Sequence, residues 1–415
     1  MAMNSRGPEP AAGQKQTSPA GGHEQRVRCE AHFRLISVLA QRVLGIDTHR
    51  LMATNKNQHF VPRCYLKAFT HNGENLAINL LNLDQRRAIP TAPVKNQCSG
   101  DYFYGKDDLL ECAIRTVEGS YAAAVARIHN PRYELTDSDR AVLRTFMLFQ
   151  HLRTEAASRR SVEMLVGMEN SIGAPLPGFK PSIKDAVQMA MRAFADEMHL
   201  FDDLKVCLVR NRTKRPFVTS DDPAVVANRW HKEDSRVRHK SPGLMACGTT
   251  VFLPLSPRIL CVAYDGDVYS VPHEHGWTDV RKDFDVAAFN EQQFLNALGN
   301  VYFGAWHDHH WVLSSYRAVQ SRRLSCRHRV NYAVLDGSDE THKRYRLVER
   351  FDAEAHEEAI IHTESLSATP SRWPPQLRWR AKGSVFTNGT GAGYIRAAQT
   401  PFRGRGGYWR ESSGH

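Results

Sequence analysis

The sequence predicts an α+β fold in which a helical, bundle-like half packs against antiparallel β-hairpins, within a single main domain that has disordered flanks. Three features of the 415-residue chain support this prediction. Long stretches with apolar residues at helical spacing come before most of the short alternating or apolar runs. The regular β-α-β alternation that is typical of a parallel sheet does not occur. Both ends of the chain are rich in Gly, Pro and Ser, which is typical of disordered segments.

The main domain is predicted over residues 52–320. Thr136 and Asp139 have the spacing of a capping box, which marks the start of a helix. The predicted elements are, in order, a strand pair at 72–91, helices at 108–129, 136–168 and 183–198, hairpins at 204–226 and 249–267, and a last helix at 284–299.

The flanks differ in composition from this domain. Residues 1–51 are predicted to be a disordered or weakly helical extension. Met52 opens the run MATNKNQHF, which we interpret as a candidate translation start. Residues 321–364 contain elements that the sequence does not define. Residues 365–415 are predicted to form a basic, aromatic-containing, disordered tail.

Composition and cysteine usage predict a cytoplasmic protein. No run of about 18 or more apolar residues occurs, so no membrane span and no membrane partner are expected. The N-terminal residues contain no apolar stretch of signal-peptide length, which argues against export. The eight cysteines are scattered without a C-x-x-C pair, as in proteins that keep reduced thiols.

The net charge of +11 is concentrated in the flanks. Residues 1–51 contribute +3 and residues 371–415 contribute +7, which leaves +1 of the total for residues 52–370. A nearly neutral core argues against recognition of a long duplex. The tail at 371–415 combines Arg with Trp and Tyr, which is typical both of single-strand binders and of solvated surface tails. Nucleic-acid binding by this tail therefore stays open.

The opening motif of the main domain is KNQHFVPRCYLKAFT, at residues 56–70. It places His59 three residues before Pro62, where a helix is expected to begin. Histidine is the side chain best suited to accept a proton near neutral pH. A hydrogen-bonded structural histidine would have the same pattern, so His59 alone does not establish catalysis.

The predicted helix at 136–168 carries polar residues on its apolar face. The stripe of Leu143, Phe146 and Met147 continues by three and four residues to Gln150, Arg153 and Thr154. A buried Arg153 requires a carboxylate, an acceptor network or an anionic ligand, because an unpaired buried charge costs several kcal/mol. Glu118, on the apolar side of the helix at 108–129, is a candidate partner, and Glu111 lies two turns earlier on a similar face. A structural ion pair and a ligand pocket are the two alternatives.

The run PFVTSDDP places Ser220 and Asp221 at the end of a short apolar segment. Polar residues at strand ends often belong to functional sites, because loops there are held by a rigid base. The same residues form ordinary turns ahead of a proline. The sequence does not decide between the two.

Six motifs occur in an order that resembles one bacterial family, domain of unknown function 4238. They are NQHFVPRCYLKAF, DYFY followed by LLECAIRTVEGSYAAAVARI, LFQHLRT, RPFVTSDDP, FLPLSP and FNEQQFLNALGNVYF. The resemblance covers about residues 54–305. It implies no established activity, but it marks a set of polar positions: His59, Tyr65, Glu111, Glu118, Gln150, Arg153, Thr154, Asp221, Pro223 and Asn290.

Two functions are consistent with these residues. The first is a hydrolase that acts on a phosphodiester or other anionic substrate, with His59 as general base, Arg153 neutralising substrate charge, and Asp221 and Glu118 orienting His59 or holding a divalent cation such as Mg²⁺ or Mn²⁺. The binding residues would then be Gln150, Thr154, Ser220, Tyr65 and Asn290. The second is a non-catalytic domain that binds a small anion or a partner, in which these residues form a structural polar network.

Overall fold

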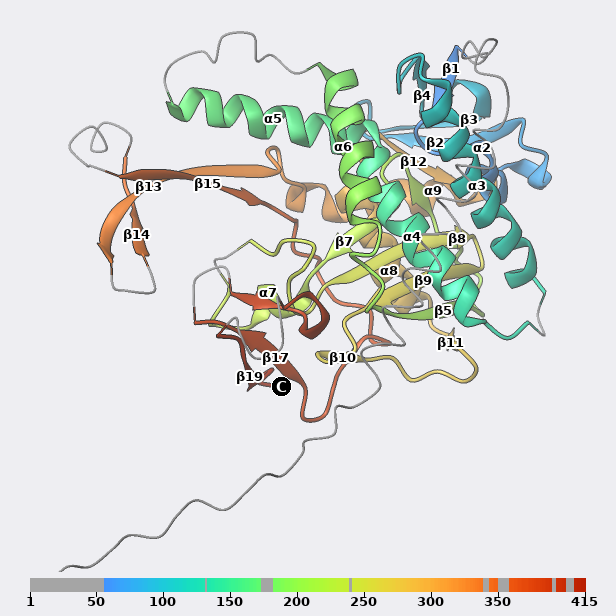
Figure 1. The fold of residues 1–415 in the computed structure, drawn as a ribbon. Coiled ribbons are helices and arrows are strands. Elements are labelled where there is room, and N and C mark those ends of the chain that lie inside the picture. Colours follow the sequence, from blue (N-terminus) through green and yellow to red (C-terminus); the bar gives the residue numbers. More distant parts are fainter. Residues whose placement is uncertain are drawn as a thin grey trace, which may run out of the picture. The chain divides into compact units, whose positions relative to one another are not determined.

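The computed structural model describes residues 56–130, 133–172, 182–238, 241–338, 343–349, 358–389, 393–400 and 407–415. The chain divides into two compact units, Met1–Met52 and Ala53–His415. All described residues belong to the second unit, so the predicted extension at 1–51 and the hypothesis about Met52 lie outside them. The second unit combines helices with several antiparallel sheets (Figure 1), which confirms the predicted α+β class.

The opening motif forms short elements around a four-stranded antiparallel sheet. That sheet has the order β3-β2-β12-β6, so the predicted strand pair is observed as β2 and β3, whose register is continued by the distant β12. The elements of this part are β1 (Asn57–His59), α2 (Arg63–Leu66), η1 (Lys67–Phe69), η2 (His71–Gly73), β2 (Ala77–Asn82), β3 (Arg87–Pro93), η3 (Val94–Asn96), β4 (Ser99–Asp101), β6 (Thr219–Ser220) and β12 (Asn300–Phe303).

Four helices follow in the sequence, and their starts are fixed by side-chain caps. Asp107 accepts hydrogen bonds from two amides at the start of α3, and the predicted capping box of Thr136 and Asp139 is present at α4. Tyr121 of α3 stacks on Phe146 of α4 with ring centroids 3.7 Å apart. The helices are α3 (Asp108–Ile128), α4 (Asp137–Arg153), α5 (Glu155–Ile172) and α6 (Ile183–Glu197).

The single helix predicted at 136–168 is wrong, because the chain breaks at Thr154. This residue has an extended conformation, with φ −75° and ψ 159°. Its Oγ1 accepts a hydrogen bond from the amide of Ala157 and donates one to Asp222, so one threonine ends α4 and caps α5. The break has consequences for the site, because it turns the two helices in different directions.

A five-stranded sheet lies next to these helices in the order β11-β5-β9-β8-β7 (Figure 1). The predicted hairpin at 249–267 is confirmed as β8 and β9. The predicted hairpin at 204–226 is wrong, because β5 pairs with β9 and β11 whereas Thr219 and Ser220 pair with β12 in the other sheet. The elements are β5 (Lys205–Asn211), β7 (Val225–Ala227), α7 (Arg229–Glu233), β8 (Thr250–Ser256), β9 (Ile259–Tyr264), β10 (Tyr269–Ser270), β11 (Trp277–Val280) and α8 (Asp283–Asn296).

The chain after β12 adds helices and a three-stranded sheet. Strand β13 lies in the middle of this sheet, and α5 packs alongside β13 and β15 (Figure 1). The elements are η4 (Trp306–Asp308), α9 (His309–Val319), η5 (Gln320–Arg322), β13 (His328–Ser338), β14 (Lys343–Leu347) and β15 (Ala359–Ser365).

The prediction that residues 365–415 are disordered requires correction over the residues that the structure describes there. Leu377 and Val385 are buried in one core cluster together with Trp230 and Tyr269. The apolar side chains of this segment thus complete a core that the preceding chain leaves open. Its elements are β16 (Arg378–Trp379), which pairs with β10, then β17 (Ser384–Thr387), β18 (Tyr394–Ile395), η6 (Ala397–Gln399) and β19 (Trp409–Ser412).

No helix among the described residues has the length and apolar character needed to cross a membrane.

Candidate functional site

Arg153, at the end of α4, is the centre of a buried network. Its side chain has no exposed surface, and all of its nitrogens are occupied. Nε donates to the hydroxyl of Tyr104 at 2.7 Å, Nη1 to Glu118 at 2.7 Å and Nη2 to the carbonyl of His59 at 2.8 Å. The guanidinium also lies 4.3 Å from the ring centre of Phe149. The expected pairing with Glu118 is therefore present, and no nitrogen of Arg153 is left for a ligand.

Gln150, His59 and Tyr65 also make hydrogen bonds in the interior of the protein. Gln150 donates from Nε2 to the carbonyl of Phe60 at 2.9 Å. His59 contributes its carbonyl to Arg153, and burial lowers the pKa of its imidazole. Tyr65 donates to the carbonyl of Pro254 at 2.6 Å, and burial raises its pKa. These residues tie the opening motif to α4 and to β8.

Asp221 binds backbone amides rather than a side chain. Its carboxylate accepts hydrogen bonds from the amides of Leu298, Gly299 and Asn300 at 2.7 to 2.8 Å. Burial raises the pKa of Asp221 to about 6, although the three donors favour its ionised form. Asp221 therefore fixes the turn between α8 and β12.

Ser220 and Asn290 hold α8 against the chain around β6. Ser220 donates to Gln293 at 2.8 Å, and Asn290 bonds the amide of Val218 and the carbonyl of Pro216. The predicted site residues thus form two groups. His59, Glu118 and Arg153 belong to one, and Ser220, Asp221 and Asn290 belong to the other. Among the described residues, no hydrogen bond or ion pair joins Asp221 to any member of the first group.

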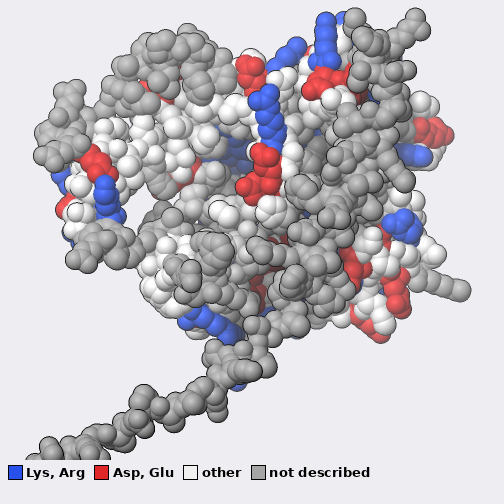
Figure 2. Space-filling view, in the orientation of Figure 1, with Lys and Arg blue, Asp and Glu red and all other residues white. Residues whose placement is uncertain are grey.

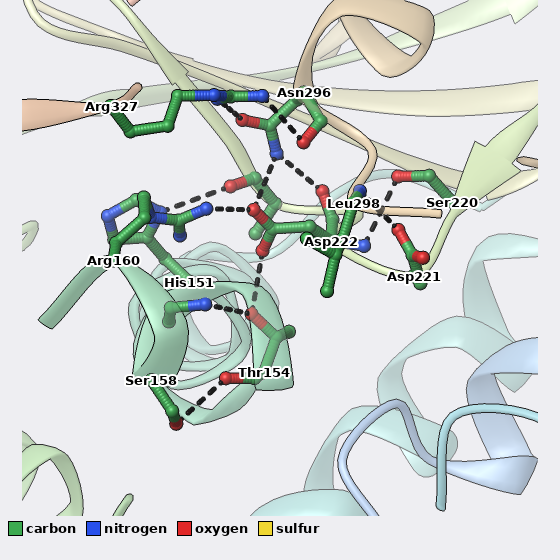
Figure 3. A network of polar contacts seen from close by, with 12 residues as sticks. His151, Thr154, Ser158, Arg160, Ser220, Asp221, Asp222, Asn296, Leu298 and Arg327 are labelled. Atoms are coloured by element: carbon green, nitrogen blue, oxygen red, sulfur yellow. Dashed lines mark hydrogen bonds and ion pairs between the residues drawn. The ribbon is translucent and has the colours of Figure 1, made fainter. Parts of the chain in front are cut away.

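Asp222, the neighbour of Asp221, is the centre of a third network that the sequence did not single out (Figure 3). Its fully buried carboxylate accepts hydrogen bonds from Thr154 at 2.8 Å, Arg160 at 2.6 Å and Asn296 at 3.0 Å. Burial alone would raise the pKa of Asp222, but Arg160, followed by His151 and Thr154, outweighs it and the pKa is lowered. Asp222 is therefore a buried carboxylate that stays ionised.

Arg327 brings a second guanidinium to this network from the chain before β13 (Figure 3). It donates to the carbonyls of Leu295 and Asn296 at 2.8 and 3.1 Å, where it caps the C-terminal end of α8. Burial, followed by the charge of Arg160, lowers the pKa of Arg327 to about 10. The two arginines are linked through this network, because Arg160 binds Asp222 and Arg327 binds Asn296, which itself donates to Asp222.

Two histidines flank the arginines. His151 lies beside Arg160 (Figure 3), and its Nδ1 is 3.3 Å from the carbonyl of Ala224. Burial, followed by Arg160, lowers the pKa of His151 to about 4, so the ring is neutral at pH 7. His328 is next to Arg327 in the chain, its ring nitrogens are shielded from solvent, and burial lowers the pKa of its imidazole. We define the anion cluster as His151, Arg160, Asp222, Arg327 and His328.

This cluster could not be predicted from the sequence pattern. Asp222 stands in the same quoted run as Asp221, but the pattern does not tell which of the two carboxylates faces the helices. Arg160 follows Arg159 directly, and the sequence does not show which of the two is buried. In the structure Arg159 pairs with Glu155 on the exposed side of α5. Arg327 lies outside every motif that was recognised.

The described part of the chain offers no group of three or more His, Cys, Asp or Glu side chains that could hold a metal ion. Among the described basic residues of the C-terminal segment, Arg378, Lys382 and Arg410 are exposed, whereas two others are tied to the rest of the protein. Arg396 is buried against Asp203, and Arg380 bonds the carbonyl of Gly266. On the face drawn in Figure 2, Lys and Arg side chains are interspersed with Asp and Glu side chains. These findings lend no support to a metal centre or to a nucleic-acid surface in that segment.

Comparison with known proteins agrees with the motif order. The model of one family, described as "Protein of unknown function (DUF4238)", matches residues 57–305. This confirms the resemblance predicted from the motifs. No curated protein and no solved structure matches the chain.

Proposed function

We propose that this chain, which belongs to the DUF4238 family, binds a small oxyanion such as a phosphate group at the anion cluster. The observation that supports the proposal most strongly is the pair of arginines around one buried carboxylate: Arg160 binds Asp222 at 2.6 Å, and Arg327 binds Asn296, which donates to Asp222 at 3.0 Å. The cluster combines residues of the family segment with residues that follow it in the chain.

The hydrogen-bonding capacity of the two arginines favours an anion. Asp222 is shared by Arg160, Thr154 and Asn296. Arg327 binds carbonyls and an amide oxygen, which carry only partial charge, and the charges of Asp222 and Glu163 counter the effect of burial and Arg160 on its pKa. An oxyanion between the two arginines would form charge-assisted hydrogen bonds.

Arg160 has the freedom that such a role requires. Its side chain is 19% exposed, whereas that of Arg153 is fully buried. Its Nη1 is bound to Asp222, and no other hydrogen bond of its guanidinium occurs among the described residues. Arg160 can therefore bind a ligand without giving up Asp222, whereas Arg153 would have to abandon a complete set of partners.

Replacing Arg160 by Gln is expected to weaken phosphate binding at least about ten-fold, since hydrogen bonds to charged groups contribute roughly 1.5–3 kcal/mol. The measurement is isothermal titration at low salt with inorganic phosphate and, separately, with adenosine monophosphate. The matched control is Arg159→Gln on the exposed side of the same helix, which should bind as the wild type does. Equal affinity of Arg160→Gln and wild type, or no binding by the wild type, would remove the proposal.

Hydrolysis of the bound phosphoester is a second candidate, favoured by the position of His151 beside Arg160 (Figure 3), which itself binds Asp222. In this mechanism His151 takes a proton from an attacking water while the arginines hold the phosphate oxygens. We expect turnover of bis(p-nitrophenyl) phosphate, assayed with and without added Mg²⁺ or Mn²⁺, to rise with pH through about 4 and to stay level near neutrality, because only the neutral ring accepts a proton.

His151→Gln should abolish this turnover, whereas His59→Ala should leave the rate per folded molecule unchanged. His129→Gln, on an exposed histidine, is the control. Retained turnover in His151→Gln would exclude the hydrolytic mechanism and leave anion binding alone.

We further propose that the protein works in a reducing compartment such as the cytoplasm. The seven cysteines that the structure describes are all free thiols, as is typical of proteins from such compartments.

A further inference from the structure

A pocket of about 490 Å³ opens beside the parallel pair β5 and β11, lined by residues outside the anion cluster. Its walls come from three places in the chain: the loop at Tyr133 and Glu134, the strand residues Arg210 and Asp279, and the loop that ends at His275. The volume falls within the range of pockets that hold small molecules, roughly 300–1,000 Å³.

The walls of this pocket are held in place by contacts that do not need a ligand. Arg210 donates to Asp279 at 2.8 Å across the parallel strands. The guanidinium also lies 5.3 Å from the ring centre of Trp277. The indole nitrogen of Trp277 donates to the carbonyl of Tyr133 at 3.0 Å, which joins β11 to the loop before α4.

The turn at His275 and Gly276 places a histidine at the mouth of the pocket. Glu274 and Trp277 exchange two backbone hydrogen bonds of 2.8 and 2.9 Å around it. Both central residues have positive φ, 48° for His275 and 83° for Gly276, as in a type I′ hairpin turn. A side chain at position 276 would meet Leu135 and Arg140 at 3.1 Å, so glycine is required there. The tight turn sets His275 3.5 Å from Glu134.

The carboxylates around the pocket narrow the class of ligand. Asp279 is neutralised by Arg210 and also contacts Arg212 and Arg281. Glu134 faces His275. A strongly anionic ligand would meet three carboxylates, those of Glu134, Glu274 and Asp279, and a strongly cationic ligand would meet the arginines. The remaining surface offers hydrogen-bond donors and acceptors beside Tyr133, Pro272 and Trp277.

We infer that this pocket is a second binding site, independent of the anion cluster, for a small uncharged polyhydroxylated ligand of the sugar class. Hydroxyl groups can both donate to the carboxylates and accept from Arg210 and the imidazoles, and the carbon skeleton of a sugar suits the apolar parts of the walls. An uncharged ligand leaves the Arg210–Asp279 ion pair intact and brings no unmatched ion into the pocket.

The test is saturation-transfer NMR of the full chain with D-glucose, N-acetylglucosamine, maltose and cellobiose, each at millimolar concentration. Binding should transfer saturation to the sugar protons. In a separate spectrum of the protein's indole N–H groups it should shift the signal of Trp277, which is assigned by its loss in Trp277→Phe. Glu134→Gln and His273→Gln, two exposed positions at the mouth, should each weaken binding several-fold. Glu74→Gln, also exposed but remote from the pocket lining, is the control.

No saturation transfer from any of the four sugars would overturn the inference, as would transfer that both mouth variants leave unchanged. A shift of the Trp277 signal produced by inorganic phosphate or ethanolamine, but not by the sugars, would also overturn it. Because Arg160→Gln does not touch this pocket, sugar binding in that variant should equal that of the wild type, which separates this test from that of the anion cluster.

Discussion

Replacing Arg153 by Met is expected to lower the free energy of unfolding by about 3–5 kcal/mol, the usual effect of removing one partner from a buried ion pair. Met fills similar space but leaves Glu118, the hydroxyl of Tyr104 and the carbonyl of His59 without their donor. Urea denaturation followed by circular dichroism measures the change. The family resemblance also made Arg153 a candidate for neutralising substrate charge in catalysis. The experiment therefore tests its structural role against this catalytic one.

The matched control is Arg159→Met, six residues further along the chain, whose side chain is 54% exposed and pairs with Glu155. Exposed pairs of this kind contribute about 0–1 kcal/mol. If Arg153→Met were as stable as Arg159→Met, the network around Arg153 would not be structural, and a role in ligand binding would have to be reconsidered.

The second large effect is expected for Arg396→Met, again about 3–5 kcal/mol. Arg396 is 2% exposed, and it joins the C-terminal segment to the rest of the unit by donating to Asp203 at 2.6 Å and to the carbonyls of Leu200 and Leu244 at 2.6 and 2.5 Å. Without it, Asp203 keeps only the amide of Gln399 among these contacts. The loss should appear in urea denaturation and as faster trypsin cleavage within residues 371–415.

Arg410→Met is the control in the same segment, because Arg410 lies on an exposed face of β19. Wild-type stability and cleavage rate in Arg396→Met would mean that the C-terminal segment is not fastened to the core as described. A disordered tail, as the composition predicted, would then be the better description.

The parts of the fold that the sequence predicted are those with local signals. The capping box of Thr136 and Asp139 and the apolar stripe of α4 needed no information from elsewhere in the chain. The break at Thr154 could not be predicted, because the acceptor that stabilises it, Asp222, is 68 residues away. The spacing of the strands in 204–226 predicts one hairpin. The prediction is wrong because Thr219 and Ser220 pair with β12.

The prediction of disorder in the C-terminal segment was wrong for a different reason. Its Gly, Pro and Arg content is typical of disorder, but composition cannot show that Leu377 and Val385 fit a core left open by β10 and α7. For the candidate site, the sequence predicted which residues are buried but not what they do. Periodicity correctly placed Gln150 and Arg153 inside, and a helical pattern cannot tell a satisfied arginine from one that awaits a ligand.

Phosphate affinity measured in parallel for Arg153→Met and Arg160→Gln tests the central claim most directly. The claim is that the motif residues build the fold while the arginines beside Asp222 bind the ligand. The folded fraction of Arg153→Met should bind inorganic phosphate as the wild type does. The folded fraction of Arg160→Gln, which also loses the ion pair with Asp222, should bind it at least about ten-fold more weakly. The opposite pattern, with binding lost in folded Arg153→Met and kept in Arg160→Gln, would contradict the account.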